Sequence, residues 1–99
     1  MITSGLPPIH PGEFLSEILG EIDISQAEFA RNIGESAMRV SHVIRGTRPV
    51  TAKLALLFGK ALDQSPEYWL NLQSAYDLEI ARKTNGGRLK SVQILAPAA

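Results

Sequence analysis

The side chains best suited to recognising another molecule gather between Ser36 and Arg45. At helical spacing, Val40, Val43 and Ile44 fall on one face of this stretch. Arginine can donate two hydrogen bonds to guanine, and apolar side chains can touch the thymine methyl group, so the opposite face is suited to the major groove of DNA. The residues that we expect to contact bases are Ala37, Met38, Arg39, Ser41 and His42.

Each of these contacts has a less specific alternative. Arg39 could bind a phosphate, which carries no sequence information, and the same holds for Ser41 and His42. Ala37 and Met38 could merely fill space. A further group is expected to bind phosphates, with a solvated surface as the alternative, and it comprises Ser36, Arg45, Arg48, Thr51 and Lys53. The last two would start a helix, where free N–H groups and a cation can together hold a phosphate.

The charge distribution supports a nucleic-acid partner although the net charge is zero. Residues 1–35 contain six acidic side chains and one basic side chain, whereas residues 36–62 contain five basic side chains and no Asp or Glu. Phosphates are met within a Debye length of about 8 Å at physiological salt, so the local charge matters more than the total. Residues 82–90 are basic again.

Two short helices joined by a glycine turn would position the recognition face. Ser25 can cap a helix from Gln26 to about Ile33, and Gly34 supplies the positive φ of a tight turn. Ser36 can cap the second helix, which should last until Gly46. This arrangement predicts a helix-turn-helix motif.

The rest of the chain predicts three more helices. Pro11 should open the first, after an arm formed by residues 1–10, with an apolar stripe of Phe14, Leu15, Ile18, Leu19 and Ile22. Thr51 should cap a helix over 52–62, and Pro66 should open one that ends near Lys83 at Asn85-Gly86-Gly87. We therefore expect an all-α, five-helix domain over 11–83, with an extended tail over 84–99 that includes a β-prone piece at 91–95.

The last helix carries more apolar and aromatic surface than a small monomer requires. Trp and Tyr are enriched at interfaces because each buries a large area and keeps a polar tip. We expect a dimer interface here, with burial in the chain's own core as the alternative. The residues concerned are Tyr68, Trp69, Leu72, Ala75, Tyr76 and Ile80.

Several other classes of protein are disfavoured. The chain has no cysteine, and its two histidines, His10 and His42, lie on separate elements. It lacks HExxH, GxSxG and P-loop spacings, so we expect no enzyme, no metal site and no cofactor. No signal peptide and no apolar run of about 20 residues is present, which predicts a cytoplasmic protein without a membrane partner.

Four strings carry a resemblance to a known family: HPGEFLSEIL, SQAEFARNIG, TAKLALLFGKAL and SPEYWLNLQSAYDLEIA. Together they resemble the HigA-type antitoxins, a branch of the Cro/C1-type (XRE) helix-turn-helix proteins. The resemblance covers roughly residues 10–83. It implies a homodimer that represses its own operon by binding a palindromic operator, and that neutralises a RelE-like (HigB-like) mRNA endonuclease toxin. It also implies that Gln26 binds a backbone phosphate.

Some positions depart from the pattern of the family. Glu35 stands where an apolar residue is usual, and Ala37 and Met38 replace more usual polar residues. The candidate toxin surface rests on charge complementarity alone, and it comprises Glu13, Glu17, Glu21 and Asp23. A solvated face is the alternative for these acidic residues. The alternative function is a stand-alone XRE-type transcriptional regulator without a toxin.

Overall fold

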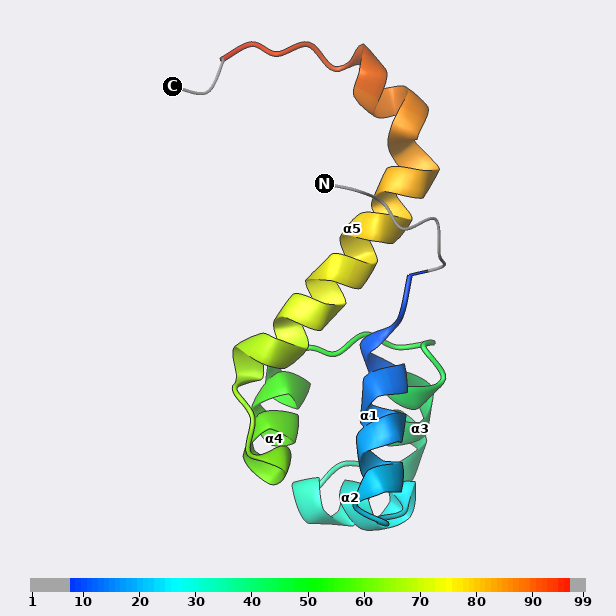
Figure 1. Ribbon diagram of the computed structural model, residues 1–99, viewed down its shortest axis with the longest axis vertical. Helices are drawn as coiled ribbons and strands as arrows, with labels where there is room; N and C mark the ends of the chain where they lie inside the picture. Colours follow the sequence, from blue (N-terminus) through cyan, green and yellow to red (C-terminus); the bar gives the residue numbers. More distant parts are fainter. Residues whose placement is uncertain (1–7, 97–99) are drawn as a thin grey trace.

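A computed structural model describes residues 8–96 of the chain, which form five helices (Figure 1). Most of the expected N-terminal arm lies outside the described residues. The predicted all-α, five-helix fold is confirmed, and the helix starts fall where the caps predict them. The helices are α1 (Pro11–Glu21), α2 (Gln26–Ile33), α3 (Ala37–Ile44), α4 (Ala52–Leu62) and α5 (Pro66–Ser91).

The core forms where the apolar faces of all five helices meet. Its centre is aromatic: the Phe58 ring lies 5.5 Å from Phe29 and 5.3 Å from Trp69, measured between ring centroids. Tilted and edge-on ring contacts of this kind add to the free energy gained from apolar burial. The predicted stripe of α1 is confirmed at Leu15 and Leu19, but Ile22 is 47% exposed because α1 ends one residue before it.

A glycine allows α1 to approach the end of α3 very closely. A Cβ at Gly12 would overlap the carbonyl oxygen of Val43 and would lie 2.8 Å from the Cα of Ile44. Real Cβ atoms do not come this close to backbone, so the contact requires glycine. The contact fixes the C-terminal end of α3 against α1, and the two helices lie side by side in Figure 1.

The fifth helix is longer than predicted. It does not end at Asn85 but continues to Ser91, with non-helical dihedral angles at Asn85 (φ −123°, ψ 15°). The first half of α5 packs along α4, whereas the second half extends beyond the other helices and gives the molecule its 50 Å length (Figure 1). Every residue from 81 to 91 is exposed.

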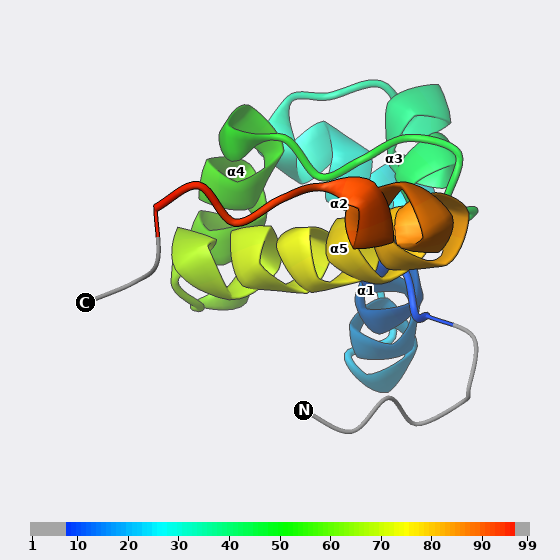
Figure 2. The same cartoon turned by 90° about the horizontal axis from the view of Figure 1, so that it is seen from above.

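The tail also differs from the prediction. Residues 84–91 belong to α5, and residues 92–96 form no strand. This short segment leads from the end of α5 back toward the side of the molecule that carries α4 (Figure 2). No helix within residues 8–96 combines the length and the hydropathy needed to cross a membrane.

Candidate nucleic-acid interface

The turn between α2 and α3 presents α3 at a defined angle. Gly34 ends α2 in the left-handed region (φ 74°), and the amide of Glu35 donates to the Ala30 carbonyl at 3.0 Å. This is the Schellman arrangement, in which glycine satisfies the last carbonyls of a helix. The hydroxyl of Ser36 then accepts from the Arg39 amide at 3.1 Å and caps α3. The predicted helix-turn-helix motif is therefore present in backbone detail.

The two faces of α3 divide as the sequence predicts. Val40 and Val43 are buried, at 1% and 0% exposure, and they fasten α3 to the core. The residues expected to contact bases lie on the remaining surface. Ala37, Met38 and Arg39 are exposed, and Ser41 and His42 are half-buried. Met38 is 68% exposed, so its side chain is accessible to a partner.

Ser41 and Arg45 are joined on this outer surface. The guanidinium of Arg45 donates to the Ser41 hydroxyl from Nε at 3.2 Å and from Nη2 at 2.9 Å. The hydroxyl can still donate its own proton, and the guanidinium keeps further N–H groups. Ser41, an expected base contact, and Arg45, an expected phosphate contact, are therefore hydrogen-bonded to each other across one turn of α3.

Glu35 joins α3 to α4. Its carboxylate lies 3.3 Å from Nη1 of Arg39 and 3.1 Å from Nζ of Lys53. The side chain of Glu35 is only 8% exposed, whereas those of Arg39 and Lys53 are 47% and 70% exposed. One carboxylate therefore pairs with two expected DNA-contacting residues, Arg39 on α3 and Lys53 on α4. The sequence pattern alone does not reveal that these two cations share a partner.

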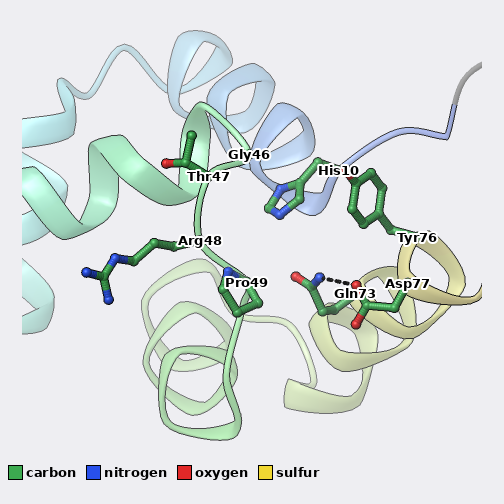
Figure 3. Close-up of a pocket in the computed structure, with 8 residues that line it drawn as sticks. All are labelled: His10, Gly46, Thr47, Arg48, Pro49, Gln73, Tyr76 and Asp77. Atoms are coloured by element: carbon green, nitrogen blue, oxygen red, sulfur yellow. Dashed lines mark hydrogen bonds between the residues drawn. The ribbon is translucent and has the colours of Figure 1, made fainter. Parts of the chain in front are cut away.

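The other expected phosphate contacts sit at helix ends and in the loop after α3. Gln26 is the first residue of α2 and is exposed, as is Thr51, whose hydroxyl caps α4 by accepting from the Leu54 amide at 3.2 Å. Arg48 lies in the loop after α3, and in Figure 3 its side chain points away from His10. These positions place free helix N–H groups and cations near α3, which is the arrangement that anions favour.

A small polar cavity of about 160 Å³ lies behind that loop (Figure 3). There His10 caps α1, since its Nδ1 accepts from the Gly12 amide at 2.9 Å, and its ring meets the Tyr76 ring edge-on at 4.9 Å. Gln73 accepts from the Val50 amide at 2.7 Å and donates to Asp77 at 2.9 Å. The residues that line the cavity therefore connect the start of α1, the loop after α3 and the middle of α5.

Lowering the pH should destabilise this junction. Burial lowers the pKa of His10 from its usual value, although Asp77, Glu13 and a hydrogen bond with the Arg48 backbone oppose the shift. The unfolded chain therefore binds the proton more readily, so stability should fall as the pH drops through about 6.5. Protonated Nδ1 also cannot accept from the Gly12 amide. Urea unfolding between pH 8 and pH 5 measures the effect.

A His10→Asn variant is the control for this prediction. Asparagine can still cap a helix but does not titrate, so the difference in unfolding free energy between the two proteins isolates His10. The wild type should lose more stability than the variant between pH 7 and pH 5.5. Parallel pH curves for the two proteins would contradict the assigned role of His10.

The residues expected at a dimer interface fall into buried, half-buried and exposed positions in the structure. Trp69 is 0% exposed and belongs to the core of its own chain, so this expectation is corrected for Trp69. Its ring packs against Phe58 because α5 lies directly on α4. Tyr68 and Ile80 are each 39% exposed and remain available. Ala75 is exposed as well, and Leu72 and Tyr76 are half-buried.

The fold and the outward face of α3 define a helix-turn-helix protein, and the helix-turn-helix family model HTH_3 matches residues 15–69. An addiction module antidote protein of the HigA family from Coxiella burnetii is 41% identical. Its structure superposes with a TM-score of 0.87 over 90% of this chain and 99% of that chain. The chain belongs to the HigA-type antitoxin family within this class.

Two more relatives agree with this assignment. The structure of Pseudomonas aeruginosa antitoxin HigA with the higBA promoter is 41% identical, with a TM-score of 0.85 over 90% of this chain and 99% of that chain. Antitoxin HigA-1 of Vibrio cholerae serotype O1 is 40% identical over an alignment 75 residues long, and the alignment covers 72% of this chain and 68% of that protein.

Proposed function

We propose that this protein is an antitoxin that represses its own operon in the cytoplasm, binding a palindromic operator as a homodimer. The observation that carries the proposal is a recognition helix that buries Val40 and Val43 and leaves Met38 and Arg39 outward. A 41% identical relative has been solved together with its promoter. Base edges would be read by α3, while the ends of α2 and α4 would bind phosphates.

A binding assay with the chain's own upstream DNA tests this proposal. The protein should bind that DNA at least a thousandfold more tightly than random duplex, which is the lower range for specific DNA-binding proteins. Salt should weaken both complexes, because phosphate contacts release counterions. Equal affinity for the two duplexes across the salt range would refute the proposal.

The homodimer is proposed to form through α5. Tyr68 and Ile80 are part-exposed on this helix. Pairing of α5 from two chains would form a dimer that carries two copies of the recognition helix α3. Ile80→Glu should raise the dimer dissociation constant about tenfold or more, because it would bury an unpaired carboxylate. Sedimentation equilibrium measures this constant.

Ser74→Glu is the matched control for Ile80→Glu. Ser74 is exposed and lies about 120° around α5 from both Tyr68 and Ile80 by helical spacing, so the same charge there should leave the dimer intact. If both variants stay dimeric at micromolar concentration, the interface lies elsewhere.

The toxin partner is proposed to be a RelE-like mRNA endonuclease encoded beside this chain. Glu13, Glu17, Glu21 and Asp23 are all exposed, on α1 and in the turn after it. A basic toxin would be attracted electrostatically to these acidic residues. They lie on α1 and in the turn after it, and therefore not on the recognition helix α3. Co-expression tests the proposal: the neighbouring protein should arrest growth alone and co-purify with this chain. A neighbour without toxicity would favour the stand-alone regulator instead.

A further inference from the structure

Glu35 is placed where a carboxylate opposes DNA binding. It is the last acidic residue before a run from 36 to 62 that contains only basic charges, and its carboxylate lies 3.1 Å from Nζ of Lys53. DNA phosphates would compete with Glu35 for the same ammonium group. A carboxylate at this position therefore lowers the affinity of the surface for phosphates of any sequence.

The same carboxylate restrains Arg39. Its Oε1 forms an ion pair with Nη1 of Arg39 at 3.3 Å, while the side chain of Arg39 stays 47% exposed. Because guanidinium has five N–H donors in a fixed plane, one engaged nitrogen orients the rest and leaves donors free. The side chain of Glu35 is only 8% exposed, so its carboxylate is largely shielded from water.

We infer that Glu35 is a specificity-determining residue that positions Arg39 for base contact and reduces the phosphate affinity of Lys53. This inference rests on the proposed function, in which α3 reads an operator. Sequence-independent binding comes from cations that neutralise phosphates, whereas discrimination comes from well-placed donors at base edges. The reduced phosphate affinity of Lys53 lowers the affinity for operator and random DNA alike, and the restraint on Arg39 raises the preference for the operator by steadying the group that reads a base.

Glu35→Gln tests the inference with little change of shape. Without the carboxylate, Lys53 should neutralise one more phosphate, and the slope of log affinity against log salt should steepen by about 0.9 on random duplex. Arg39 loses its restraint, so the ratio of operator affinity to random affinity should fall about threefold to tenfold, part of the discrimination that one arginine provides. Both affinities are measured by fluorescence anisotropy between 50 and 300 mM salt.

Two further variants separate this role from a purely structural one. Glu28→Gln removes the same charge from an exposed position of α2, so it reports the effect of net charge alone and should change the ratio by less than twofold. Adding Lys53→Gln to Glu35→Gln should return the salt slope to about the wild-type value. Thermal unfolding monitors the fold of each variant.

The outcomes are distinct. A steeper slope and a lower ratio for Glu35→Gln support the inference. An unchanged ratio and slope, or an equal loss on both duplexes at constant slope, would overturn it and would leave only a structural role for Glu35. A wild-type protein that does not prefer the operator would instead overturn the proposed function, whatever Glu35→Gln does to the salt slope.

Discussion

Arg39→Ala is expected to bind the operator about 5- to 150-fold more weakly than the wild type. This range corresponds to about 1–3 kcal/mol, the discrimination that a bidentate arginine–guanine contact provides. Arg39 has an exposed guanidinium on the outward side of α3, and Glu35 holds only one of its nitrogens within 3.3 Å. The loss should fall mainly on the operator, so the variant should also discriminate less among sequences.

Lys53→Ala is the comparison for Arg39→Ala. Lys53 lies on the first turn of α4 and is 70% exposed, and its ammonium group can serve phosphates but is far less suited to bidentate base contact. This variant should weaken operator and random DNA by similar factors, because the Glu35 carboxylate then lacks its lysine partner and repels phosphates of any sequence. It should change the salt slope by much less than one, because Glu35 already holds the Lys53 ammonium group. If Arg39→Ala also weakens both duplexes equally in gel-shift titrations, Arg39 binds a phosphate and another residue reads the base.

Gly12→Ala should lower the free energy of unfolding by about 1–3 kcal/mol, the usual range for overpacking a tight core. The new methyl group would overlap the Val43 carbonyl oxygen and lie 2.7 Å from the carbonyl carbon. Backbone cannot rotate away as a flexible side chain can, so α1 and α3 must separate. Because α3 carries the recognition face, operator affinity should fall along with stability. Urea unfolding and gel-shift titration measure the two effects.

Gly20→Ala is the matched control within the same helix. A Cβ at Gly20 meets nothing within 4 Å, and alanine is the better helix former by about 0.5–1 kcal/mol. This variant should be slightly more stable than the wild type and should bind DNA unchanged. If Gly12→Ala were as stable as Gly20→Ala, the close contact between α1 and α3 would not exist in solution.

Local signals made most of the fold predictable from the sequence. Ser25, Ser36, Thr51 and Ser65 each precede a helix and each cap it through the side-chain oxygen. Gly34 adopts the positive φ that the turn of a helix-turn-helix motif requires. Caps and turns depend on a few neighbouring residues, so their chemistry can be read from the sequence without knowledge of the tertiary structure.

Contacts between distant segments were not predictable in the same way. Gln73 caps the Val50 amide across 23 positions, and Glu35 reaches Lys53 on another helix. Only the packing of whole helices brings these groups together. Trp69 was expected at an interface because tryptophan suits both interfaces and cores, and composition alone does not separate the two.

The predicted end of α5 was wrong for a different reason. Asn85-Gly86-Gly87 is a common helix terminator, but two glycines within an exposed helix cost only about 2 kcal/mol relative to alanine. The side-chain amide Nδ2 of Asn85 donates to the Ala81 carbonyl at 2.9 Å, and the chain remains helical beyond the local distortion. The helix therefore continues to Ser91, and the tail begins later than the composition suggested.

The proposed function requires α3 to lie in the major groove of one duplex twice, once from each chain of a dimer. Methylation interference on the chain's own upstream DNA tests it most directly, because methyl groups at guanine N7 project into the major groove. This binding mode predicts two clusters of interfering guanines on one face of the duplex, about 10 base pairs or a multiple of that apart. Binding that tolerates methylation at every guanine N7, or that is blocked only from the minor groove, would contradict it.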